Sequence, residues 1–264
     1  MTQFTQPALT LMQLAAFRDL RARGIVDEQG CVYAGHSLGE YSALACVSQV
    51  MPVETLASVV FYRGLCMQVA VERDETGRSN YGMCAVNPSR VGCPCSEEML
   101  REIVLTIAEM TGSLIEIVNL NVSNMQYVCA GELRALDVLM GVLDGLQGTR
   151  HLRSLTEAAI HNTESKPKPL KLARGRATIP LDGIDVPFHS TYLRSGVESF
   201  RTFLRDKLTV DNIDPARLVN KYIPNVVARP FELTREFCEY VYATTASPRV
   251  CQVLQDWQSF AATA

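Results

Sequence analysis

The 264-residue chain contains no run of about 18 consecutive apolar residues, so we expect no transmembrane helix. The stretch from Met1 to Met12 also lacks the basic segment followed by an apolar segment that marks a secretory signal peptide. The formal net charge is −3, and no excess of positive charge suggests binding to nucleic acid or to an anionic membrane. We therefore expect a cytoplasmic protein without a nucleic-acid or membrane partner.

Cysteine pairs with the spacing of metal or redox motifs are also missing. The chain has nine cysteines, an odd number, and no CxxC pair. Cys93 and Cys95 are too close together for an ordinary zinc knuckle, and no second pair accompanies them. We expect reduced, mostly buried thiols and no metal site, rather than a disulfide framework.

The overall composition is that of a globular protein. Hydrophobic residues make up 47% of the chain and charged residues 20%. A chain of this length can form one large α/β domain, or one domain with a smaller insert. Hydrophobic spacing and turn residues predict alternating helices and strands. We expect helices at 7–23, 38–50, 52–71, 97–110 and 132–146, and strands at 31–34, 81–86, 114–120 and 126–130.

The order of the elements changes after a polar loop in the first third of the chain. From Tyr81 the order is strand, helix, strand, strand, helix, which is the start of a βαββαβ unit. We therefore expect a small α+β subdomain at 82–150, inserted into a core formed by 1–81 and 151–264. The segment 163–176 is rich in Lys and Arg. We expect an exposed loop there, with docking of an acidic partner as the alternative.

The segment from Gly35 to Gly39 reads GHSLG and lies between an expected strand and an expected helix. A nucleophile elbow, the sharp turn that presents a catalytic serine, has this context. Side chains at positions 35 and 39 would crowd such a turn, so we expect glycine to be needed at both. Ser37 would stand at the head of a helix, where the helix dipole and the Leu38 N–H can stabilise an oxyanion. A tight turn with a capping serine is the alternative.

A serine hydroxyl is a poor nucleophile until a base takes its proton. The chain offers four histidines. His36 adjoins the serine and should project elsewhere, while His151 and His161 lie in polar sequence that we expect to be mobile. His189 follows an apolar Val-Pro-Phe segment and precedes an expected helix, so it should be held in place. We expect His189 to be the base, with a purely structural histidine as the alternative.

Taken together, these motifs resemble those of malonyl-CoA:acyl-carrier-protein transacylases. Residues 35–41 (GHSLGEY) are similar to the active-site signature, and residues 186–190 (VPFHS) to the segment with the catalytic histidine. Residues 62–64 (YRG) are similar to the segment with the substrate-binding arginine, and residues 6–9 (QPAL) to the early helix. The order and spacing of the motifs agree over nearly the whole chain.

A finer resemblance is to the malonyl/palmitoyl transferase domain of fungal type I fatty acid synthase β subunits. It rests on residues 61–65 (FYRGL), on residues 116–121 (EIVNLN) and on the basic linker before residues 184–187 (IDVP). Family members carry a Gly-Gln-Gly motif upstream of the early helix. This motif is missing here, so we expect the chain to be a fragment of a larger polypeptide.

The resemblance implies a fold and a set of site residues. The implied fold is α/β, an α/β-hydrolase-like core with a parallel sheet plus an inserted ferredoxin-like α+β subdomain. Ser37 would be acylated, and His189 would be its base. Substrate contacts are implied for Leu38, His36 and Asn121. Asn121 is expected in the turn between two strands, and a purely turn-forming asparagine is its alternative.

The resemblance assigns Arg63 to the free carboxylate of malonyl. A guanidinium binds a carboxylate through two parallel hydrogen bonds, which lysine cannot reproduce. An acetyl group would leave the buried arginine unpaired, at a cost of several kcal/mol. A surface arginine on a solvated helix face is the alternative.

The implied activity is transfer of malonyl, and in the fungal proteins also palmitoyl, between CoA and the phosphopantetheine of an acyl carrier protein. It would proceed through an acyl-serine in fatty acid biosynthesis, with no tightly bound cofactor and with other fatty acid synthase domains as partners. One alternative is a serine esterase or thioesterase of similar architecture. The other is a truncated, non-catalytic fragment of a synthase.

Overall fold

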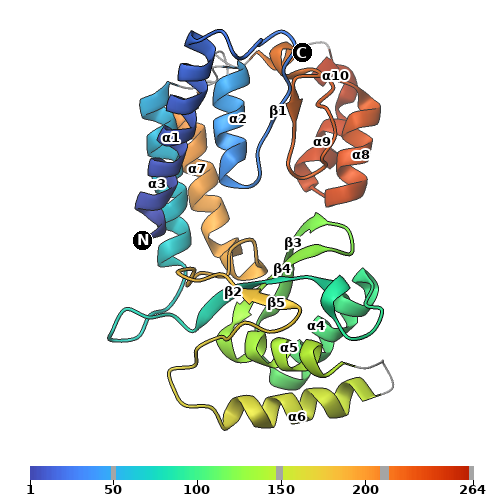
Figure 1. The fold of residues 1–264 in the computed structure, drawn as a ribbon. Helices are drawn as coiled ribbons and strands as arrows, with labels where there is room; N and C mark the ends of the chain where they lie inside the picture. Colours follow the sequence, from blue (N-terminus) through green and yellow to red (C-terminus); the bar gives the residue numbers. More distant parts are fainter. Residues whose placement is uncertain (49–51, 147–150, 209–213, 262–264) are drawn as a thin grey trace. The chain divides into compact units, whose positions relative to one another are not determined.

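The computed structural model describes residues 1–48, 52–146, 151–208 and 214–261 (Figure 1). These residues form two compact units, each with its own β-sheet. The first unit combines Met1–Cys66 with Glu198–Ala264, and the second is the continuous stretch Met67–Val197. Among the described helices, none combines the length and the apolar composition needed to cross a bilayer.

The first unit is mostly helical around a short parallel sheet. Strand β1 (Tyr33–Ala34) pairs in parallel with β6 (Tyr222–Ile223). Leu14, Leu56 and Val60 form a buried apolar cluster between the first and third helices, and partly buried residues of the second helix pack against it. The helices of this unit are α1 (Thr2–Ala22), α2 (Leu38–Ser48), α3 (Val53–Val69), α7 (Val197–Lys207), α8 (Arg235–Thr245), α9 (Pro248–Gln255) and α10 (Trp257–Ala261), with α3 and α7 crossing into the second unit at one end.

The second unit is built on a four-stranded antiparallel sheet. The strands lie in the order β3-β4-β2-β5, so β4 and β2 are central. This strand order is that of the ferredoxin-like βαββαβ unit expected from the sequence, with one additional helix, α6, between the second helix of the unit and its last strand. The elements are β2 (Tyr81–Val86), α4 (Glu97–Thr111), β3 (Ile115–Val122), β4 (Gln126–Glu132), α5 (Leu133–Gly145), α6 (Leu152–Glu164) and β5 (Thr178–Pro180).

Helix α4 shows how local sequence sets an element of this unit. The Ser96 hydroxyl caps the helix by accepting a hydrogen bond from the Met99 N–H at 3.3 Å. Gly112 ends it with a φ of 63°, a left-handed conformation that glycine adopts without penalty. The helix buries one apolar stripe at helical spacing, which packs into the main core of the unit. The stripe consists of Leu100, Ile103, Val104 and Ile107.

Helix α6 corrects one expectation. The sequence around His151 and His161 was expected to be mobile, but His151 precedes the first turn of this helix and His161 lies in its last turn. The helix packs on α5, where a Cβ atom added at Gly141 would lie 3.3 Å from the Cβ of Ala159. Both histidines are exposed, and the His151 side chain makes no capping hydrogen bond to the helix.

The second unit extends beyond the range 82–150 that we expected for the insert. Strand β5 pairs with β2, which puts the fourth strand of the sheet well after residue 150. Helix α6 belongs to the same unit because it packs on α5. The compact unit therefore includes part of the range 151–264 that we had expected in the core.

Candidate active site

The turn that carries Ser37 joins the end of β1 to the start of α2. Strand β1 ends at Ala34 and α2 begins at Leu38, so Ser37 is the last residue before the helix. Its φ is 53°, in the left-handed region that few residues other than glycine adopt. The Gly39 N–H donates to the His36 carbonyl at 2.9 Å and closes the turn. This strand-turn-helix geometry is the one that a nucleophile elbow requires, and the role of Ser37 as the nucleophile stays a prediction.

The two glycines of the elbow differ in their roles. A Cβ atom added at Gly35 would lie 2.1 Å from the carbonyl carbon of Gly39 and 2.4 Å from the Glu40 nitrogen. No side chain fits there, because the atoms in the way are backbone. At Gly39 an added Cβ would meet no atom of the described residues within 4 Å. The expectation that both positions require glycine is therefore wrong for Gly39.

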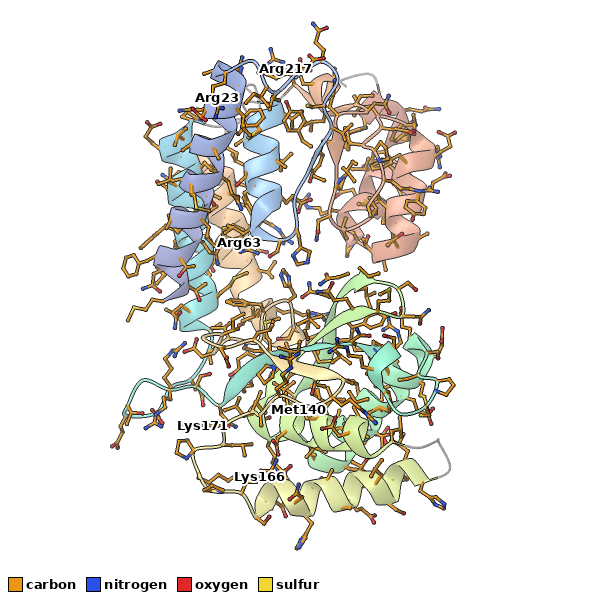
Figure 2. The ribbon with its side chains drawn as sticks, in the orientation of Figure 1. Arg23, Arg63, Met140, Lys166, Lys171 and Arg217 are labelled. Atoms are coloured by element: carbon orange, nitrogen blue, oxygen red, sulfur yellow. The ribbon has the colours of Figure 1, made fainter. Side chains whose placement is uncertain are left out.

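Arg63 belongs to α3 (Figure 2). Its guanidinium lies against the hydroxyl of Ser37. Its Nη2 donates a hydrogen bond to Ser37 Oγ at 3.0 Å, and its Nη1 donates to Gln6 Oε1 at 2.7 Å. Arg63 is only 9% exposed and Gln6 only 6%. The interpretation of Arg63 as a solvated surface residue is thus excluded, because its side chain is buried beside Ser37.

The electrostatics around Arg63 are unusual for a buried cation. Within the part of the chain that the structure describes, it forms no ion pair with an Asp or Glu. Its Cζ lies 5.4 Å from the centroid of the Tyr41 ring, a cation–π contact. Burial lowers the pKa of Arg63, and Tyr41 and Glu40 offset part of that effect. A guanidinium stays protonated in proteins, so this site carries a buried positive charge that can bind an anion.

Gly64 explains how α3 comes close enough to α1 for these contacts. A Cβ atom at this position would lie 2.7 Å from the Gln3 Cα and 2.8 Å from the Thr2 carbonyl oxygen. Only glycine permits this approach of the two helices. Gly64 therefore lets α3 pack on α1 at the position next to Arg63, which contacts Gln6 of α1.

Glu40 fixes the first turn of α2 to the neighbouring strand. Its carboxylate accepts hydrogen bonds from the Tyr222 hydroxyl and, at 2.8 Å, from the Asn225 N–H. Burial raises the pKa of Tyr222, and the hydrogen bond to Glu40 adds to the rise. The hydroxyl consequently stays protonated and keeps donating. These contacts hold the helix whose N-terminus faces the serine.

His189 and Asn121 lie in the second compact unit, whereas Ser37, Leu38, His36 and Arg63 lie in the first. The structure thus brings Ser37 and Arg63 together, and the pairing of Ser37 with His189 stays a prediction. His189 also has a left-handed backbone, with a φ of 64°.

Asn121 departs from the expected location. It is an exposed residue of β3, at a point where the pairing with β4 shifts register, and not a turn residue. The turn follows it, and Asn124, with a φ of 56°, is the asparagine that the turn needs. The turn-forming role weighed for Asn121 therefore belongs to Asn124.

Two residues at the site were not assigned a role from the sequence. Gln6 was noted only as part of the early helix, and Tyr41 only as part of the serine motif. Gln6 and Thr10 share the buried stripe of α1 with Leu14, at intervals of one helical turn. A polar side chain on the buried stripe of a helix needs a polar partner, and that signal could have pointed to Gln6.

The fold and the site define a serine acyltransferase architecture, and comparison with known families agrees. Residues 1–247 match the family model described as the acyl transferase domain. The chain belongs to this family. In the described residues no group of three or more His, Cys, Asp or Glu is placed to hold a metal ion.

Within this family, the chain is similar to fungal fatty acid synthase β subunits. The chain is 53% identical over 267 residues to the fatty acid synthase beta subunit TOXC of Cochliobolus carbonum. It is 48% identical over 276 residues to the fatty acid synthase subunit beta of Saccharomyces cerevisiae. Each alignment covers 98% of this chain but only 13% of the relative. These matches confirm the fungal resemblance inferred from the motifs.

Solved structures show the same fold. The malonyl CoA-acyl carrier protein transacylase (fabD) from Coxiella burnetii matches with a TM-score of 0.60 and 25% identity, covering 92% of this chain and 61% of that one. The corresponding transacylase from Clostridium perfringens matches with a TM-score of 0.58 and 24% identity, covering 92% and 60%. The fold is therefore the α/β fold of these transacylases.

Proposed function

We propose that this chain transfers malonyl between CoA and the phosphopantetheine thiol of an acyl carrier protein, as part of fatty acid biosynthesis. One observation carries the proposal. The buried guanidinium of Arg63 donates a hydrogen bond to Ser37 Oγ, so a nucleophile and an anion-binding group share one site. The names of the relatives, which are fatty acid synthase β subunits and malonyl transacylases, support the same substrate and carrier.

The reaction begins with Ser37. His189 removes the hydroxyl proton as Oγ attacks the thioester carbonyl of malonyl-CoA. The negative charge that develops on the carbonyl oxygen faces the Leu38 N–H, which lies in the first turn of α2 and has no acceptor within the helix. The C–S bond breaks, and CoA leaves as a thiol with the proton from His189. A carrier thiol then reverses these steps, so the kinetics are ping-pong.

Arg63 supplies the selectivity for malonyl. In the present structure one of its Nη atoms contacts Ser37, and the other contacts Gln6. The distal carboxylate of malonyl would take hydrogen bonds from this guanidinium fork and neutralise the buried charge. Acetyl lacks that carboxylate and leaves the charge unpaired. A palmitoyl chain would require the Arg63 side chain to swing aside.

Three further substrate contacts belong to the proposal. Leu38 binds the oxyanion through its backbone. His36, which is exposed next to the serine, would contact the incoming thioester, and Asn121, an exposed residue of β3, would line the cleft. The other domains of a fatty acid synthase are the proposed partners, and no tightly bound cofactor takes part.

The test compares malonyl and acetyl transfer from CoA to pantetheine in the wild type, in Arg63→Ala and in Arg63→Lys. We expect malonyl transfer to fall about 100-fold or more in Arg63→Ala, because the loss of a buried charge pair is worth about 3 kcal/mol. The rate of acetyl transfer in Arg63→Ala should stay unchanged or increase. Arg18→Ala, an exposed arginine of α1, is the matched control and should leave both rates unchanged.

Equal losses for malonyl and acetyl in Arg63→Ala would rule out the carboxylate-binding role. Rapid hydrolysis of malonyl-CoA with no transfer to pantetheine would instead favour the serine thioesterase alternative, since the elbow is common to both classes.

A further inference from the structure

The backbone at His189 adopts a conformation that is unfavourable for residues other than glycine. Its φ of 64° lies in the left-handed region. Such a conformation persists only where surrounding contacts determine it strongly, and it is common at catalytic sites. The contacts of the loop on either side of His189 therefore bear on how this residue is held.

One anchor lies just after His189. Glu116, on β3, accepts a hydrogen bond from the Thr191 N–H at 2.8 Å and a second from the Thr191 hydroxyl. Thr191 begins a short 3-10 helix, Thr191–Gly196, and a carboxylate at the start of a helical turn satisfies an otherwise unpaired N–H. Glu116 thereby fixes the chain two residues beyond the histidine.

A second anchor lies just before His189. The Asp185 carboxylate accepts a hydrogen bond from Arg73 Nη1, which also donates to the Gly77 carbonyl at 2.9 Å. The Asp185 carbonyl accepts a further hydrogen bond from the Ser79 hydroxyl. The polar loop before β2 thus holds the chain four residues ahead of the histidine.

Between the anchors the loop is packed and internally bonded. Val186 is fully buried, and Ser190 is only 5% exposed. The Ser190 hydroxyl donates to the Pro187 carbonyl at 2.7 Å, and the Ser190 N–H donates to the same oxygen at 3.2 Å. A loop closed in this way and fixed at both ends leaves its backbone little freedom.

We propose that Glu116 and Asp185 are positioning residues for His189. Both act on the backbone of its loop, Glu116 through Thr191 and Asp185 through Arg73 and Ser79, and neither serves as the acid of a catalytic triad. The consequence for catalysis rests on the proposed function, in which His189 is the base. A base displaced by about 1 Å loses roughly 100-fold in rate, so small changes in this loop should be visible.

Both anchors lie near the surface, which separates positioning from global stability. The side chains of Asp185 and Arg73 are 45% and 22% exposed, and Thr191 is exposed. Partly exposed ion pairs and hydrogen bonds contribute little to overall stability. Loss of these contacts should therefore change the position and mobility of His189 more than it changes the free energy of unfolding.

The experiment uses the full chain with Glu116→Ala, Glu116→Gln and Asp185→Ala. Glu102→Gln, an exposed glutamate of α4, is the matched control. Three quantities are measured for each variant: the thermal midpoint, the rate of Ser37 acylation by malonyl-CoA as a function of pH, and the ring NMR signals of His189 through a pH titration. The His189→Ala variant assigns those signals among the four histidines.

We expect Glu116→Ala and Asp185→Ala to acylate about 10- to 100-fold more slowly at every pH, with thermal midpoints close to the wild type. Their His189 signals should shift, broaden or double. Glu116→Gln keeps an acceptor for the Thr191 N–H and should recover much of the rate, and Glu102→Gln should match the wild type throughout.

Wild-type rates together with unchanged His189 signals in both alanine variants would overturn the proposal. A rate loss that merely follows the unfolded fraction would overturn it too, because that result indicates a stability role. If the wild type itself is not acylated, the proposed function fails, and the His189 signals still decide whether the two carboxylates hold the loop.

Discussion

The turn that carries Ser37 brings the backbone of Gly39 against the α-carbon of Gly35. At the same point the Arg63 guanidinium reaches the serine hydroxyl from α3. The local sequence could predict the elbow, because a strand, a glycine-flanked serine and a helix follow one another within a few residues. It could not predict the contact between Arg63 and Gln6, which lie 57 positions apart and meet only because Gly64 lets two helices approach.

Alanine at the two elbow glycines should change the stability of the protein in opposite directions. Gly35→Ala should destabilise the protein by about 3 kcal/mol, because its Cβ would overlap backbone atoms that cannot move aside. Gly39→Ala should be neutral or stabilise by up to about 1 kcal/mol, because it adds a better helix former in open space within α2. Denaturant unfolding of the two variants measures both effects. Equal destabilisation by the two changes would contradict this reading of the turn.

At the scale of elements, the sequence predicted those with a clear apolar period but not those that depend on packing against another element, among them helix α6. Strand β2 has the expected bounds, and α4 differs by one residue at its end. Helix α6 was missed because its sequence is largely polar and its stability comes from packing on α5. A buried charge reinforces that packing: Asp137 on α5 accepts hydrogen bonds from Thr163 at 2.7 Å and from Lys166 at 2.9 and 2.7 Å.

Asp137→Ala should therefore loosen α6. We expect a loss of about 2–3 kcal/mol, because the change removes hydrogen bonds to a charged acceptor whose side chain is 3% exposed. The Lys166 side chain is 37% exposed and can turn to water, which limits the loss. Glu157→Ala, an exposed position on α6, is the control and should stay within about 0.5 kcal/mol. Chemical denaturation gives both values, and an Asp137→Ala variant as stable as the control would contradict the role of this cluster.

At the scale of the whole molecule, the chain divides into a discontinuous unit and a continuous one. The sequence predicted the ferredoxin-like topology but placed its end at residue 150. The fourth strand, β5, has only three residues and follows a long basic segment, so no local pattern tied it to β2. Long-range strand pairing of this kind is set by the sheet and not by the strand itself. The chain also spans only 13% of the length of its curated relatives.

The continuous unit should fold without the rest of the chain. Residues 67–197 contain the complete four-stranded sheet and the largest apolar core, which includes Leu100, Leu136 and Leu143. We expect an isolated 67–197 fragment to unfold cooperatively and to show dispersed amide signals in an NMR spectrum. A fragment with no cooperative transition would show that its core depends on the first unit.

The most direct test of the central claim is the intact mass of the protein after incubation with malonyl-CoA. We expect one malonyl adduct on the wild-type chain, located on Ser37 by peptide mapping and removed by pantetheine. We expect no adduct on a folded Ser37→Ala variant. An adduct that persists in Ser37→Ala, or a folded wild-type chain that acquires none, would contradict the assignment of Ser37 as the residue that carries malonyl.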